Sequence, residues 1–268
     1  MTHLSYILLP RLTAFESPAQ LKRVLAHLRE CGYEGVELNI TEPLGIAPAL
    51  LEEMMAEIGL AVPSFLTGEA YADGLCLSSP DATVRGRTVE RLVGYVAVAA
   101  RFHAILVVGL LQGLRRDEPN ADVANERIVD GLKQVARAAR ANGVDLVIEP
   151  VNHLQVGFNN TVAEVQSLIA AIGSPAVRPM VDTIHLNIEE RSLIQPILDC
   201  GPALRHVHLC ESNGGAFGTG HVDFAAVGRA LAQIGYDRFA SVKVYRHSTL
   251  EAAARESLEY LRRSGFGR

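Results

Sequence analysis

The stretch Val144-Asp-Leu-Val-Ile-Glu-Pro-Val-Asn-His153 joins an apolar run to a carboxylate, a proline and two further polar side chains. A buried parallel strand reads as a continuous apolar run, so residues 144–148 are predicted to form one. Pro150 ends this strand because proline cannot donate a hydrogen bond to the ladder. Glu149 is therefore expected at the end of a buried strand, where its carboxylate either faces a ligand or makes a local salt bridge.

The same alternation of apolar run and helical pattern recurs along the whole chain. Eight strand and helix units in 268 residues are typical of a (β/α)8 TIM barrel, which we predict as a single domain over residues 1–268. A doubly wound open sheet is the rival fold, but no G-x-G-x-x-G motif follows the first strand. The predicted strands cover 6–9, 35–39, 61–66, 104–109, 144–148, 177–182, 204–209 and 240–245, and the predicted helices cover 17–30, 47–58, 81–101, 122–142, 161–172, 193–199, 224–234 and 250–262.

Composition narrows the class of protein. The chain has 30 acidic and 25 basic residues, so it lacks the positive field that attracts nucleic acid. No run reaches the roughly 18 apolar residues of a membrane span, and the amino terminus does not read as a signal peptide. The four cysteines are scattered without a C-x-x-C pair. We expect a cytoplasmic protein that binds neither nucleic acid nor membrane.

Polar side chains are predicted at the carboxyl ends of four consecutive strands. Glu149 follows the fifth strand, Asp182 ends the sixth, His206 and His208 lie in the seventh, and Lys243 lies in the eighth. The two histidines are two residues apart and point to the same side of their strand. Two carboxylates and an imidazole suit a divalent cation, so these residues predict a metal site or the remnant of one. A histidine hydrogen-bonded within the core is the simpler alternative.

Other candidates come from the strand exits and from one long loop. Residues 67–80 form a loop of more than about 12 residues after a strand, which makes its 71–80 part a candidate lid over the site. Glu211 follows the seventh strand, where it either orients a ligand or caps a turn. Glu37 and His103 are candidates for lining the barrel.

Several motifs resemble the xylose isomerase-like barrels, a family that includes ketose 3-epimerases and hydroxypyruvate isomerases. Two segments are similar more particularly to the keto-sugar-acid epimerase branch, namely Thr67-Gly68 and Gly74-Leu-Cys-Leu-Ser-Ser-Pro80. The motifs that carry the general resemblance are Ile148-Glu-Pro-Val-Asn152, Val181-Asp-Thr-Ile-His-Leu-Asn187, His206-Val-His-Leu-Cys-Glu-Ser212 and Gly218-Thr-Gly-His-Val-Asp-Phe224.

The resemblance implies an activity and a cofactor. It implies an isomerase or epimerase of a small carbohydrate, keto-sugar or sugar acid that moves a proton beside a carbonyl. It also implies one divalent cation (Mn, Mg, Co or Zn) held by Glu, Asp, His and a second Glu, which polarises the carbonyl while the two Glu move the proton. Glu149, Asp182 and His208 match the first three ligands, and His185 matches a histidine that contacts substrate.

Three positions depart from the pattern that the resemblance implies. Lys243 stands where the second metal-binding Glu is expected, Gln155 replaces a glutamate, and Gly214 replaces an arginine. We therefore predict Glu149 and Lys243 as catalytic residues. For substrate binding we predict His185, Gln155 and Glu211.

The positive charge of Lys243 also determines whether a divalent cation is expected to bind. At an effective dielectric constant of about 20, an ammonium roughly 4 Å from a divalent ion is repelled by about 8 kcal/mol, so metal binding is expected to be weakened or lost. Either Lys243 is neutral, or it swings away, or it neutralises the carboxylates without a metal.

The alternative function is a non-catalytic or metal-independent sugar-binding barrel in which Lys243 replaces the metal-ligand glutamate. A phosphodiester-cleaving relative would need more metal ligands and a basic face. The sequence is compatible with a homo-oligomer.

Overall fold

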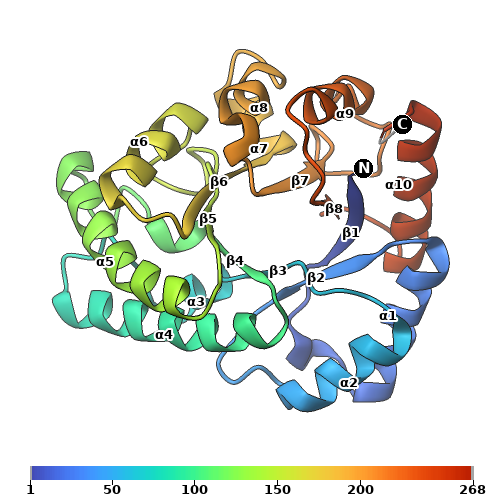
Figure 1. Cartoon of the computed structure of the whole chain (residues 1–268), viewed down its shortest axis with the longest axis horizontal. Coiled ribbons are helices and arrows are strands. Elements are labelled where there is room, and N and C mark those ends of the chain that lie inside the picture. Colours follow the sequence, from blue (N-terminus) through green and yellow to red (C-terminus); the bar gives the residue numbers. More distant parts are fainter. Residues whose placement is uncertain (1, 267–268) are drawn as a thin grey trace.

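Eight parallel strands close into a barrel, each strand pairing with the next along the chain and β8 pairing with β1 (Figure 1). The computed structural model describes residues 2–266. This single barrel confirms the predicted (β/α)8 fold. The strands are β1 (His3–Leu8), β2 (Gly35–Asn39), β3 (Ser64–Leu66), β4 (Ile105–Val108), β5 (Leu146–Ile148), β6 (Val177–Asp182), β7 (His206–Cys210) and β8 (Phe239–Lys243).

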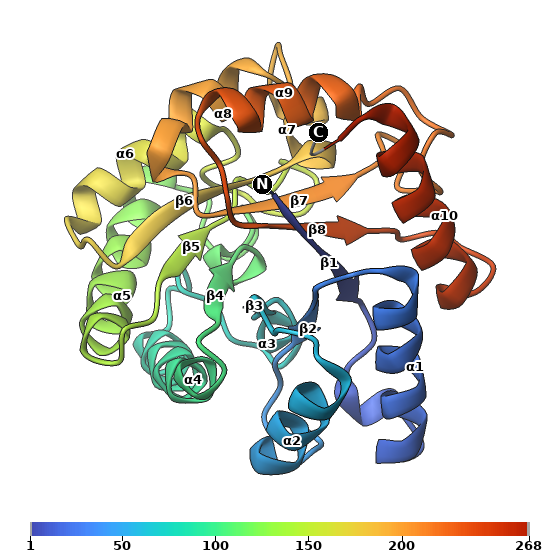
Figure 2. The ribbon, with the colours of Figure 1, turned by 45° about the vertical axis from the view of Figure 1, so that its right-hand side comes forward.

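Helices form a ring around the outside of the strands (Figure 2). Within residues 2–266, none of them combines the length and the low polarity needed to cross a bilayer. The helices are α1 (Pro18–Cys31), α2 (Pro48–Ile58), α3 (Glu69–Ala72), α4 (Ala82–Arg101), α5 (Ala121–Ala141), α6 (Val162–Ile172), α7 (Thr183–Glu189), α8 (Gln195–Cys200), α9 (Phe224–Gln233) and α10 (Leu250–Ser264), with short 3-10 turns at Leu12–Ala14, Leu110–Gln112 and Gly201–Ala203.

Local sequence signals set the helix ends as predicted. The Ser17 side chain accepts a hydrogen bond from the backbone N–H of Gln20 and caps α1, which ends at Gly32 with a left-handed φ of 107°. Thr161 and Glu164 form a reciprocal capping box at the start of α6. These contacts satisfy backbone groups that a helix leaves unpaired at its ends.

The interior of the barrel is divided into an apolar part and a polar part. The apolar part is a separate buried cluster from β4, β5 and β6, formed by Ile105, Val107, Val147 and Met180. The polar part comes from β1, β2, β3, β7 and β8 and consists of Ser5, Glu37, Ser64, His206 and Ser241, all buried. Barrel interiors are usually filled by bulky apolar residues, so a polar half needs an internal hydrogen-bond network.

Several local predictions differ from the structure. β1 begins at His3 rather than at residue 6, and the short helix α3 lies within the predicted loop 67–80. β3 covers only the last part of the predicted strand 61–66, because Pro63 has no N–H to donate to a ladder. The segment after Asp182 forms helix α7, which was not predicted. His103 does not line the barrel: it is exposed, with a φ of 53°, in the turn between α4 and β4.

Candidate active site

A cavity of about 350 Å³ opens at the carboxyl ends of the strands. Tyr71 and Ala72, at the start of the predicted 71–80 lid, lie in its wall beside Gly68, whereas Leu75 and Leu77 further along are buried. The predicted site residues that line the cavity are Glu149, Gln155, His185, His208 and Lys243. Strand ends therefore bring these five side chains together from distant parts of the sequence.

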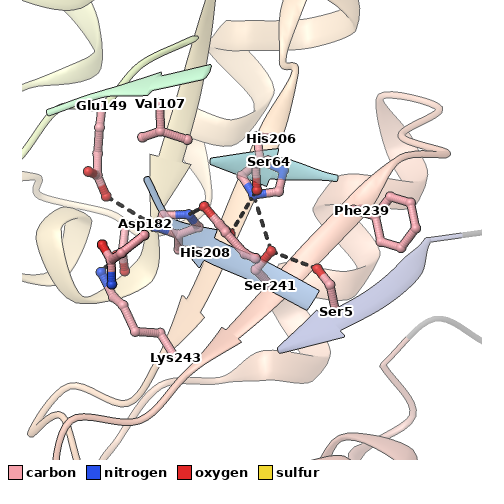
Figure 3. A network of polar contacts seen from close by, with 12 residues as sticks. Ser5, Ser64, Val107, Glu149, Asp182, His206, His208, Phe239, Ser241 and Lys243 are labelled. Carbon is pink, nitrogen blue, oxygen red and sulfur yellow. Dashed lines mark hydrogen bonds and ion pairs between the residues drawn. The ribbon is translucent and has the colours of Figure 1, made fainter. Parts of the chain in front are cut away.

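Glu149, Asp182 and His208 form a buried cluster with one ligand atom from each within 4.8 Å of the others. The His208 Nδ1 atom lies 3.2 Å from Glu149 Oε1 and 3.4 Å from Asp182 Oδ2. The cluster forms because β5, β6 and β7 are neighbours, with Asp182 directly opposite His208 in the register (Figure 3). These donors are of the types that can hold a divalent cation.

Lys243 points into the same cluster from the end of β8. Its Nζ atom donates a hydrogen bond to Asp182 Oδ2 and lies 5.2 Å from the centre of the Tyr245 ring. Burial alone would lower the pKa of Lys243, but the negative charge of Asp182 outweighs it and holds that pKa well above its ordinary value. Lys243 is therefore an ammonium paired with Asp182, and it neither swings away nor loses its proton.

Both carboxylates of the cluster are ionised. Burial would raise the pKa of Asp182, but the Lys243 ammonium outweighs it and keeps that pKa well below the usual range. Burial would also raise the pKa of Glu149, but the hydrogen bond from His208 and the charge of Lys243 outweigh it and lower that pKa. Glu149 is thus a charged carboxylate at the cavity wall.

The donor set can be tested for its fit to a metal ion. Asp182 Oδ1 accepts a hydrogen bond from the Ile184 N–H at 3.0 Å, and Oδ2 accepts one from Lys243. A cation at this cluster would share Asp182 Oδ2 with an ammonium of the same sign, which is a strongly repulsive arrangement. The three donors alone fit a divalent cation, but with Lys243 in this position they do not.

Glu37 links the cluster to the polar interior of the barrel. Its two carboxylate oxygens each lie 3.1 Å from a histidine, Oε2 from His206 Nε2 and Oε1 from His208 Nε2. Burial would lower the pKa of His208, but Glu37 and the carboxylates on its other side raise it well above normal. His206, by contrast, has a lowered pKa, mainly because it is buried. Glu37 therefore fixes the orientation of the His208 ring.

The polar network continues beneath His206. Its Nε2 atom lies 3.1 Å from Ser241 Oγ, which in turn lies 2.7 Å from Ser5 Oγ (Figure 3). These contacts satisfy the polar groups that replace the usual apolar filling of the barrel.

His185 enters the cavity from the first turn of α7. The Asn152 amide donates to His185 Nδ1 at 2.8 Å, so the other ring nitrogen, Nε2, carries the proton when the ring is neutral. Burial lowers the pKa of His185, which favours that neutral form. The Nε2 atom lies 3.7 Å from Glu149 Oε1 and 3.8 Å from Asp182 Oδ2. Asn152 was not predicted to have a role, although it belongs to the Glu149 motif.

Comparison with known proteins agrees with this geometry. Residues 25–264 match the xylose isomerase-like TIM barrel family. The chain belongs to this family. An L-ribulose 3-epimerase from Mesorhizobium japonicum is 33% identical over 227 residues, which are 84% of this chain and 75% of that relative. A ketose 3-epimerase from Arthrobacter globiformis is 33% identical over 213 residues, 78% of this chain and 72% of the relative.

A solved structure of an L-ribulose 3-epimerase superimposes closely on this barrel. The TM-score is 0.86 at 26% identity, and the match covers 98% of this chain and 94% of that one. The likeness thus extends over the whole xylose isomerase-like barrel and includes the strand ends that carry the candidate site.

The remaining residues singled out in the sequence, namely the predicted substrate-binding residues Gln155 and Glu211 and the departing position Gly214, lie in different places. Gln155 lines the cavity. Glu211 is not among the cavity-lining residues: its carboxylate accepts hydrogen bonds from the N–H groups of Ser212 at 3.0 Å and Gly218 at 2.8 Å. Gly214 has a left-handed φ of 68°, and its carbonyl accepts from the Tyr245 N–H at 3.0 Å. Glu211 and Gly214 shape the loop after β7.

Because of the Asp182–Lys243 pair, we expect the free energy of unfolding to decrease at low pH. The pKa of Asp182 is held below the value of about 3.9 that it has in an unfolded chain, so the unfolded state takes up this proton first. The free energy of unfolding should fall as the pH drops from about 5, by up to about 1.4 kcal/mol per pH unit for this one group.

Urea unfolding at several pH values between 7 and 3 measures this effect for the native protein and for Asp182→Asn. The native protein should show the steeper loss of unfolding free energy below pH 4. Equal pH dependence in the two proteins would contradict the assignment.

Proposed function

We propose that the protein is an epimerase that inverts a carbon next to the carbonyl of a small keto sugar. The observation that carries this proposal is the 33% identity to an L-ribulose 3-epimerase over 84% of the chain. A cavity of about 350 Å³ is within the range of small-molecule sites and suits a monosaccharide. Sugar acids belong to the same candidate class, because the site carries an ammonium that can pair with a carboxylate.

The proposed chemistry is proton transfer through Glu149. Its carboxylate takes the proton from the carbon beside the carbonyl. The electron pair of the broken C–H bond forms a C=C bond, and the π pair of the carbonyl moves onto its oxygen. A water molecule on the opposite face then returns a proton to that carbon. The hydroxide left behind takes the proton from Glu149, which restores the carboxylate. We assign the His185 Nε2–H the role of donor to an oxygen of the substrate.

Deuterium exchange tests the proposal. The native protein is incubated in heavy water with ketopentoses, ketohexoses and keto-sugar acids, and proton NMR follows each sugar. We expect one C–H signal beside the carbonyl to be lost as the epimer appears, for at least one member of the panel. Binding of a sugar without exchange would favour the non-catalytic sugar-binding barrel instead. The absence of both binding and exchange across the panel would overturn the proposal.

A further inference from the structure

The Lys243 ammonium pairs with Asp182, one of the carboxylates whose negative charge a bound cation would otherwise neutralise. Lys243 lies at the end of β8 opposite Cys210 of β7 in the register, and it is buried, with 5% of its surface exposed. Its ammonium contacts the oxygen of Asp182 that also faces His208, at 3.4 Å from Nδ1. The ammonium is therefore paired with one of the three ligand groups of the cluster, at an oxygen that a metal ion would also need.

The charge at this position is the same with the lysine as with a metal. In the pattern implied by the family resemblance, a divalent cation and a fourth ligand, a glutamate, together contribute one positive charge to the site. A lysine at position 243 contributes one positive charge alone. Replacing the glutamate by lysine and losing the ion therefore together leave the net charge at this position unchanged. Asp182 and Glu149 remain carboxylates in both arrangements.

We propose that the Lys243 ammonium takes the place of the divalent cation, so that this member of the family works without a metal. The inference rests on the proposed epimerase function for its catalytic part, whereas its metal-binding part stands on the geometry of Lys243 and Asp182. A metal at Glu149, Asp182 and His208 would have to displace the ammonium from Asp182 Oδ2.

The ammonium is able to assist the proton transfer. It has three N–H donors, and the bond to Asp182 uses one of them. Tyr245 lies beside the ammonium, and at least one further donor is available to oxygens in the cavity, which Lys243 lines together with Glu149. A donor held at the carbonyl oxygen stabilises the negative charge that develops there when Glu149 removes the proton. The backbone of β8 holds this charge in place before substrate arrives.

Metal binding is tested first, without any need for activity. Metal content is measured by elemental analysis after purification without chelator, and Mn²⁺ is titrated calorimetrically into the native protein, Lys243→Glu and Lys243→Met. We expect substoichiometric metal and no Mn²⁺ binding in the native protein, and one Mn²⁺ bound per chain in Lys243→Glu. Lys243→Met, which removes the charge without adding a ligand, should bind Mn²⁺ more weakly than Lys243→Glu. Tight stoichiometric binding by the native protein, unchanged in Lys243→Glu, would overturn the proposal.

Activity is tested second, on a sugar that the native protein epimerises. Chelator treatment should leave the native rate unchanged, and Lys243→Met should lose about 10²–10³-fold in kcat without recovery in Mn²⁺. Lys22→Met is the matched control, because Lys22 is half-exposed on α1 and pairs with Glu57; its activity should equal that of the native protein. Loss of native activity on chelation, restored by Mn²⁺, would refute a metal-independent site. If no sugar reacts, the epimerase proposal fails, and the calorimetry still decides whether Lys243 replaces the ion.

Discussion

Glu149→Gln is expected to lower kcat/KM for epimerisation by about 10²–10⁴-fold, because general acid–base catalysis contributes an effect of this size. Glutamine keeps the shape of the side chain and can still accept from His208, which lies 3.2 Å from the carboxylate. The fold should therefore survive while the proton acceptor is lost. Initial rates of deuterium exchange and of epimer formation measure the effect, and both should fall together.

Glu189→Gln is the matched control for this substitution. Glu189 lies at the end of α7, outside the cavity lining, and accepts from the backbone N–H of His153 at 2.7 Å. The control should retain the native rate. If Glu149→Gln exchanges deuterium as fast as the native protein does, Glu149 is not the base and another group must remove the proton.

Asp182→Asn is expected to lower the free energy of unfolding by about 3–5 kcal/mol, because it leaves the buried Lys243 ammonium without its charged partner. Asparagine retains an oxygen that can cap α7 at the Ile184 N–H, so the loss reports mainly the ion pair. Equilibrium urea unfolding of both proteins at pH 7 gives the difference.

Two further variants separate the ion pair from other effects of the substitution. The double variant Asp182→Asn with Lys243→Met removes both charges and should regain most of the lost free energy. Asp145→Asn makes the same chemical change in a pair with Arg205, whose side chains are 27% (Arg205) and 30% (Asp145) exposed, and should cost only about 0.2–1 kcal/mol. A double variant no more stable than Asp182→Asn would show that the pair does not account for the loss.

The fold was predictable because each unit of the barrel carries its own local signal. Apolar runs such as residues 144–148 predict buried strands, and the Thr161 and Glu164 capping box marks the start of a helix. The carboxyl ends of parallel strands meet at one edge of a barrel. This rule alone was enough to predict that Glu149, Asp182 and His208 lie together, and the structure brings them together.

The partners within the site were not predictable, because they depend on register and distance. Glu37 is separated from His208 by 171 residues and Lys243 from Asp182 by 61, and no local pattern joins such pairs. Glu37 is a charged residue in the short apolar strand β2, which indicates that it needs a buried partner. The sequence does not indicate which residue that partner is. Helix α7 was missed because its sequence between Thr183 and Glu189 has no strong helical period.

The two oxygens of Asp182 separate the support of α7 from the contact with position 243. Oδ1 holds the start of α7 through the Ile184 N–H, while Oδ2 meets Lys243. A new residue at position 243 releases only Oδ2, so the backbone that carries His185 keeps its support. Lysine and glutamate codons differ at a single base. With Lys243 in the place of the ion, one point mutation separates a barrel that must bind a metal ion from one that carries the cation as part of its own chain.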